Sequence, residues 1–121
     1  MWGAQVQKFP FGQMGIDQGR LILFSHFADG GPMWTGHGPR ESRSRVTFTE
    51  QFMAVPAVQV AVSMWDADQK TNLRADISTD DVRMDGFDIV FRTWADSRIA
   101  RIRADWTAFG PVRDADQWNV D

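Results

Sequence analysis

Apolar and polar residues alternate along much of this chain with a period of two, which is the period of a β-strand. The alternation is clearest between Gly86 and Gly110. In the first of two runs the core-facing row is Phe87, Ile89, Phe91 and Thr93. In the second run the apolar row is Ala100, Ile102, Ala104, Trp106 and Ala108. The polar tip Ala95-Asp96-Ser97 between the runs predicts a β-hairpin, with Trp94 outside the core-facing row.

Four other segments have the length and composition of strands. They are residues 21–24, 45–49 with Val46 and Phe48 inward, 58–64 with Trp65 on the outward row, and 73–78 with Arg74 on its polar row. No window favours the spacing of three and four that a helix requires. About six strands separated by turn residues predict an all-β fold, either a sandwich or a barrel.

The segments outside these strands divide the chain into three parts. Residues 1–18 show neither period and predict an extended N-terminal arm, which is either a partly ordered tail or a docking arm. Residues 19–110 form the β-domain, and 111–121 form an acidic tail. Within the domain, the Gly- and Pro-rich stretch 28–44 predicts a long loop that carries His37 and Arg40.

Composition narrows the possible partners. At 121 residues the chain is one domain, and a net charge of −3 provides no general attraction to nucleic acid or to an anionic membrane surface. There is no cysteine, which excludes disulfides and thiolate chemistry. The N-terminus does not resemble a signal peptide, and no apolar run is long enough for membrane insertion. Six Trp and nine Phe without Tyr exceed the need of a small core, so some should contact a partner.

No motif supports catalysis. The chain lacks a G-x-S-x-G sequence, and its aspartates lie mostly in predicted turns, so we predict that it is not an enzyme and uses no cofactor. Residues 66–72 lack the glycine and the closing glutamate of a calcium loop. His26 and His37 have no cysteine to complete a metal site, and none is predicted.

Two interpretations remain for the exposed residues. The charged row with Arg101, Arg103 and Asp105 is typical of ion pairs within a sheet or between subunits. Sugars present an apolar face and a rim of hydroxyls, so their sites combine an exposed Trp with polar side chains. Trp94, Arg74 and the loop with His37 and Arg40 fit that combination.

An ordered set of residues between about 19 and 110 resembles the H-type lectin family, which includes snail agglutinins and the C-terminal domain of slime-mould discoidins. The set consists of Arg40, Val46-Thr47-Phe48, Phe52, Pro56, Val58, Asp66, Asn72-Leu73-Arg74, Gly86-Phe87, Thr93-Trp94-Ala95-Asp96, Ala104, Trp106 and Ala108. The resemblance implies a six-stranded antiparallel β-sandwich that forms a homotrimer, or a dimer of trimers, with sugar sites between protomers. The missing cysteines are consistent with a bacterial or phage-like member.

The resemblance also assigns site residues. It places Arg74 and Trp94 in contact with the sugar. We predict that His37, Arg40 and Asp96 are neighbours of the site. The family's acidic residue, which grips the hydroxyls of N-acetylgalactosamine, corresponds to His37 by ungapped counting, and Ala95 replaces a histidine of snail relatives. The expected ligands are glycans, either N-acetylgalactosamine-like sugars or another surface polysaccharide.

Two functions follow from these observations. The first is a trimeric, non-enzymatic lectin that acts at an extracellular or particle surface. The alternative is a structural spike, fibre or assembly component of a phage-like particle, in which the fold serves trimerisation and host attachment. In the alternative, the aromatic arm docks the protein to a larger assembly.

Overall fold

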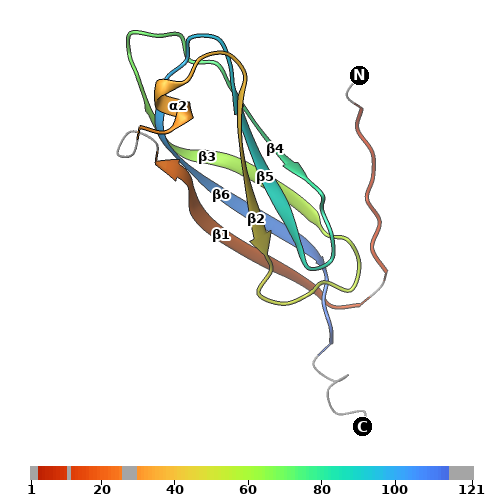
Figure 1. Ribbon diagram of the computed structural model, residues 1–121. Coiled ribbons are helices and arrows are strands. Elements are labelled where there is room, and N and C mark those ends of the chain that lie inside the picture. Colours follow the sequence, from red (N-terminus) through yellow and green to blue (C-terminus); the bar gives the residue numbers. More distant parts are fainter. Residues whose placement is uncertain (1–2, 11, 26–29, 115–121) are drawn as a thin grey trace.

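The computed structural model describes residues 3–10, 12–25 and 30–114, which form a sandwich of two three-stranded antiparallel sheets (Figure 1). In spatial order, the first sheet contains β1 (Met14–Ser25), β6 (Ile99–Pro111) and β3 (Ala57–Ala67). The second contains β2 (Arg40–Thr47), β5 (Gly86–Thr93) and β4 (Ala75–Asp80). A one-turn helix, α2 (Pro32–Thr35), precedes β2. The predicted six-stranded antiparallel β-sandwich is confirmed.

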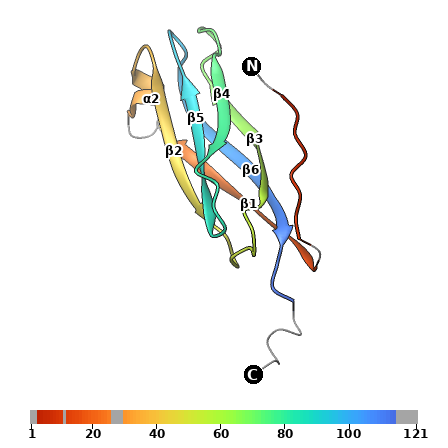
Figure 2. The same ribbon diagram turned by 90° about the vertical axis from the view of Figure 1, so that its right-hand side faces the viewer.

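The predicted hairpin between residues 86 and 110 is wrong. β5 pairs with β2 and β4, whereas β6 pairs with β1 and β3, so the turn at 94–98 crosses from one sheet to the other. Figure 2 shows the two sheets as separate layers. The error has a physical cause, because alternation shows which face of a strand is buried but not which strand lies beside it. Two strongly apolar rows can face each other across a core as readily as they can share one sheet.

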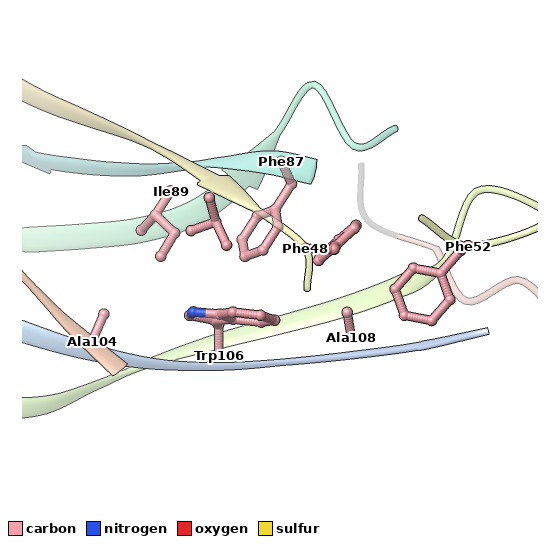
Figure 3. Close-up of a cluster of buried hydrophobic side chains, with 8 residues drawn as sticks. Phe48, Phe52, Phe87, Ile89, Ala104, Trp106 and Ala108 are labelled. Atoms are coloured by element: carbon pink, nitrogen blue, oxygen red, sulfur yellow. The ribbon is translucent and has the colours of Figure 1, made fainter. Parts of the chain in front are cut away.

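The apolar rows themselves lie where the sequence predicts. Phe87 and Ile89 on β5 face Ala104 and Trp106 on β6 across the core (Figure 3). The small alanines of β6 leave room for large rings from the opposite sheet, and the Phe87 and Trp106 ring centroids are 5.5 Å apart. Trp106 also covers Gly19 on β1, where an added Cβ would meet its ring at 2.8 Å.

Trp65 lies on the row that faces the other sheet rather than on the predicted outward row, although on the edge strand β3 it is 47% exposed. The pairing of β3 with β6 shifts register between Val62 and Met64, which is a β-bulge. One extra residue reverses the faces beyond it. As a result Met64 pairs with Arg103 on the outer row, and the Trp65 ring approaches buried Phe91, with 6.2 Å between centroids.

The segment boundaries also differ from the sequence prediction. β1 begins at Met14, inside the segment predicted as an arm, because its alternation starts there with glycines on the inward row. The predicted long loop ends at Arg40, where β2 begins. His26 and most of the acidic tail lie outside the described residues.

Ion pairs cover the outer face of the β2-β5-β4 sheet. Arg43 on β2 donates to Asp88 on β5 and to Asp80 on β4, each at 2.8 Å. Its side chain therefore spans β5, and Val90 beneath it is fully buried despite facing outward. Arg45 similarly contacts Asp81 and Asp88, each at 3.2 Å. These ion pairs neutralise most of the charge on the outer face of the β2-β5-β4 sheet.

The charged row on β6 also finds partners within its own sheet. Arg101 donates to Asp66 at 3.0 Å, and Arg103 donates to the Ser63 hydroxyl at 3.1 Å. Asp105 accepts from Arg20 on β1 at 2.7 Å. The interpretation as ion pairs within a sheet is confirmed for Arg101 and Asp105, whereas Arg103 bonds to Ser63, and the role of the row between protomers stays a prediction.

These pairs predict a loss of stability in acid. Hydrogen bonds from Arg20 lower the pKa of Asp105 from 3.8 to about 2. Those from Arg43 and Arg45 lower the pKa values of Asp80 and Asp88. Because the folded pKa is depressed, the stabilisation is complete above the unfolded value and disappears as the pH falls through the folded value.

We therefore expect the melting temperature to fall between about pH 5 and about pH 2. Thermal melting monitored by circular dichroism in that range tests this expectation. Asp105→Asn should melt lower than wild type at pH 7 and should lose part of the pH dependence. A melting temperature that stays constant down to pH ~2 would contradict the expectation.

Candidate functional site

Three connections gather at one end of the sandwich, around the label α2 in Figure 1. They are α2 with residues 36–39, the β3–β4 connection at 68–74, and the β5–β6 connection at 94–98. The Gly38 amide donates to the Ala95 carbonyl, and the Asp68 amide donates to the Arg98 carbonyl, each at 2.9 Å. The residues predicted for the site, which are Arg74, Trp94, His37, Ala95, Asp96 and Arg40, all lie in or beside these connections.

Two buried hydroxyls fix the backbone of Arg74. The Ser97 hydroxyl accepts from the Arg74 amide at 2.8 Å and donates to the Asn72 carbonyl. The Thr93 hydroxyl donates to the Arg74 carbonyl at 2.5 Å. Thr93 and Ser97 flank the turn that carries Trp94, so the same contacts fix Arg74 relative to the tryptophan.

The Arg74 side chain makes an ion pair with Asp96. Its Nη1 lies 2.7 Å from Oδ1 of Asp96, and both side chains are partly exposed. Ala75 pairs with Thr93, so Arg74 lies next to Trp94 at the same end of the β4–β5 ladder. The Trp94 side chain is itself exposed. The structure therefore places Arg74, Asp96 and Trp94 close together.

Arg40 supports the site through backbone contacts. Its guanidinium donates to the carbonyls of Gly38, Ala95, Pro32 and Met33 at distances between 2.8 and 3.3 Å. Burial lowers the pKa of Arg40, and carbonyl oxygens partly replace its water. Arg40 therefore holds α2 and the β5–β6 turn together.

Ala95 contributes its backbone rather than its side chain. Its φ of 58° is in the left-handed region, and its carbonyl accepts from both Gly38 and Arg40. A positive φ at an alanine costs free energy, which these contacts offset. His37 is exposed and does not line the hollow beside Trp94.

A second aromatic contact closes this end of the sandwich. The Arg98 guanidinium lies 4.4 Å above the centre of the Trp34 ring, and its Nε donates to the Trp34 carbonyl at 3.0 Å. Arg98 also lies 3.7 Å from the carboxylate of Asp68. These contacts tie α2 to the other two connections.

A hollow of about 270 Å³ adjoins Trp94. Its lining consists of Pro39, Arg40, Glu41, Arg92, Thr93 and Trp94. Glu41 on β2 and Arg92 on β5 are cross-strand neighbours joined at 3.0 Å. Neither residue was predicted for the site. Alternation places Arg92 on the same row as Trp94, but only the β2–β5 register places Glu41 beside them.

Larger hollows exist elsewhere, and those of about 400 and 390 Å³ lie on the β1-β6-β3 sheet beside Asp105 and Thr107. Others lie at the other end of the sandwich. Two of about 320 and 340 Å³ lie around Glu50, Phe52 and Arg113. Phe52 is buried, and no exposed aromatic ring lines either hollow. Size alone therefore does not single out a hollow, and the hollow beside Trp94 differs from these two by its exposed aromatic ring.

Among the described residues, no three His, Asp or Glu side chains converge as metal ligands would. In that same part of the chain, no helix is long and apolar enough to cross a membrane.

Residues 43–109 match the sequence model of the H-type lectin domain. The chain belongs to the H-type lectin domain family. Arg74, Trp94, Ala95 and Asp96 lie inside the matched segment, whereas His37 and Arg40 precede it.

Two curated proteins are similar to this chain. The chain is 58% identical over 108 residues to the protein named ATP synthase subunits region ORF 7 of Fuscovulum blasticum, covering 89% of this chain and 94% of that protein. It is 33% identical over 75 residues to discoidin-1 of Dictyostelium discoideum, covering 61% of this chain but only 30% of the discoidin.

The fold also matches a solved structure. Discoidin II of Dictyostelium discoideum superposes with a TM-score of 0.71 at 20% sequence identity. The match covers 88% of this chain and 40% of that chain. This H-type lectin domain therefore shares the fold of one part of discoidin II.

Proposed function

We propose that this H-type lectin domain is a glycan-binding module without catalytic activity. The observation that carries the proposal is the exposed Trp94 beside the Arg74–Asp96 ion pair, with the Arg74 backbone held by the buried hydroxyls of Thr93 and Ser97. Trp94 stacks on the apolar face of a sugar, while Arg74 donates to hydroxyl oxygens and Asp96 accepts from hydroxyl groups. Rigid positioning of these groups reduces the entropy lost on binding.

Replacing Trp94 with alanine is expected to weaken glycan binding about 30-fold, because a stacked aromatic commonly contributes about 2 kcal/mol or more. A glycan array first selects the best ligand of the wild-type protein, and calorimetric titration with that ligand then compares the two proteins. Met84→Ala is the matched control, since Met84 is similarly exposed at the opposite end of the sandwich. Equal binding by Trp94→Ala and wild type would refute the assigned role.

The proposal includes a homotrimer that uses the outer face of the β1-β6-β3 sheet. Exposed apolar side chains occur on this face at Met14, Ile16, Ile22 and Phe109. Several sites on one trimer would add avidity to weak single sites. Sedimentation equilibrium tests this part of the proposal, and a monomer at micromolar concentration would contradict it.

An assembly role is the second candidate, and the N-terminal arm favours it. Residues 3–8 are exposed, and in both views the arm lies apart from the two sheets (Figures 1 and 2). The Gln7 side chain donates to the Val55 carbonyl at 2.8 Å and ties the arm to the domain. An exposed arm of this kind can dock the domain at an extracellular or particle surface.

Deletion of residues 1–12 separates the two functions, because it ends before β1 begins at Met14. Glycan binding should then stay within about twofold of wild type, since Gln7 bonds to Val55 in the β2–β3 connection rather than to the connections that carry the site, and surface changes are usually small. Loss of glycan binding in this variant would place the arm in the site instead.

A further inference from the structure

Trp94 has polar groups on both of its sides. It follows β5, the central strand of its sheet, with β4 on one side and β2 on the other. Arg74 and Asp96 lie on the β4 side. The hollow lined by Glu41 and Arg92 lies on the β2 side, and nothing in the family match assigns a role to this pair.

Glu41 and Arg92 keep hydrogen-bonding capacity for a ligand. The bond between them is 3.0 Å long, and their side chains are 44% and 46% exposed, so several donor and acceptor positions still face solvent. A carboxylate accepts about four hydrogen bonds and a guanidinium donates five. Neighbouring contacts are longer, with 3.8 Å from Arg92 to Asp76 and 3.6 Å from Arg43 to Glu41.

The positive charges around the hollow are compensated. Arg40 and Arg92 line it together with Glu41, and Asp76 lies 3.8 Å from Arg92. Arg43, which lies 3.6 Å from Glu41, is paired with Asp80 and Asp88. The Arg40 guanidinium is already engaged by four backbone carbonyls, so it offers few donors to a ligand. The hollow therefore has no excess positive charge that would attract an acidic sugar, and this favours a neutral ligand.

We propose that Glu41 and Arg92 recognise two adjacent hydroxyls of a neutral pyranose whose apolar face stacks on Trp94. Arg92 donates to one hydroxyl oxygen, and Glu41 accepts from the neighbouring hydroxyl. Adjacent hydroxyl oxygens of a pyranose are spaced by about a hydrogen-bond length, similar to the separation of the two side chains. The inference rests on the proposed glycan binding and names its specificity-determining pair.

The test compares Glu41→Ala with Asp76→Ala. Both remove a strand carboxylate near Arg92, but only Glu41 lines the hollow. The probes are immobilised neoglycoproteins carrying glucose, galactose, mannose, N-acetylgalactosamine, glucuronate or galacturonate. Wild type should bind at least one neutral probe, and should bind no uronate more tightly than its neutral parent. Glu41→Ala should weaken binding at least about tenfold, and Asp76→Ala less than about threefold.

Monodeoxy forms of the best neutral sugar distinguish a direct contact from a structural role. Removing the recognised hydroxyl should weaken binding by wild type about tenfold, yet leave binding by Glu41→Ala almost unchanged. If Glu41→Ala binds like wild type while Trp94→Ala does not, this inference fails and the proposed function stands. If a uronate binds more tightly than its neutral parent, the neutral class is wrong. If wild type binds no probe and no array glycan, both proposals fail.

Discussion

Replacing Phe91 with alanine is expected to lower the free energy of unfolding by about 4 kcal/mol, a large share of the total for a domain of this size. Phe91 is completely buried on the central strand β5. Its ring lies between the sheets, 5.5 Å from the Phe24 ring on β1 and 6.2 Å from the Trp65 ring on β3, measured between centroids. Alanine would remove both ring contacts and leave a cavity. Chemical denaturation should therefore show unfolding at a lower midpoint concentration of denaturant.

Met84→Ala is again the control for this effect. It removes an exposed apolar side chain, and the expected loss is below about 0.5 kcal/mol. A loss below about 1.5 kcal/mol for Phe91→Ala would mean that the two sheets do not pack through this ring. Because the same cluster includes Met33 of α2, the variant should also loosen the end of the sandwich that carries Trp94.

Much of the fold follows from alternation along the chain. The buried rows on β5 and β6, and the inward positions of Val46 and Phe48, are confirmed because the core removes apolar side chains from water on one face of each strand. Alternation does not predict which strands pair or where bulges occur. The pairing of β5 with β2 and β4, and the reversal of Trp65, depend on contacts between distant segments that no local pattern encodes.

The candidate site was likewise predictable only where alternation along the chain reveals it. Trp94 is a large ring on the polar row of a strand, and such a departure from the pattern is visible in the sequence. The roles of Ser97 and Thr93 are not visible there. Their hydroxyls bond to backbone groups 19 to 25 residues away, which only the folded chain brings near. The position of Glu41 beside Arg92 depends likewise on the β2–β5 register.

Replacing Ser97 with alanine is expected to lower the free energy of unfolding by about 3 kcal/mol, because it leaves two backbone groups without a partner. Ser97 is fully buried, and its hydroxyl serves both the Arg74 amide and the Asn72 carbonyl. The ion pair of Arg74 with Asp96 would lose one of its two backbone anchors, so glycan binding should weaken about tenfold as well. Chemical denaturation and calorimetric titration measure the two effects on the same preparation.

The matched control is Ser44→Ala, which removes the same hydroxyl from β2, away from the Arg74 backbone. It should cost less than about 0.5 kcal/mol and leave glycan binding unchanged. Amide hydrogen exchange adds a local readout, since the Arg74 amide should exchange faster in Ser97→Ala while β6 core amides change only with global stability. If Ser97→Ala were as stable as Ser44→Ala, the hydroxyl would not fix Arg74. The rigidity of the site would then depend on Thr93 alone, whose hydroxyl holds the Arg74 carbonyl.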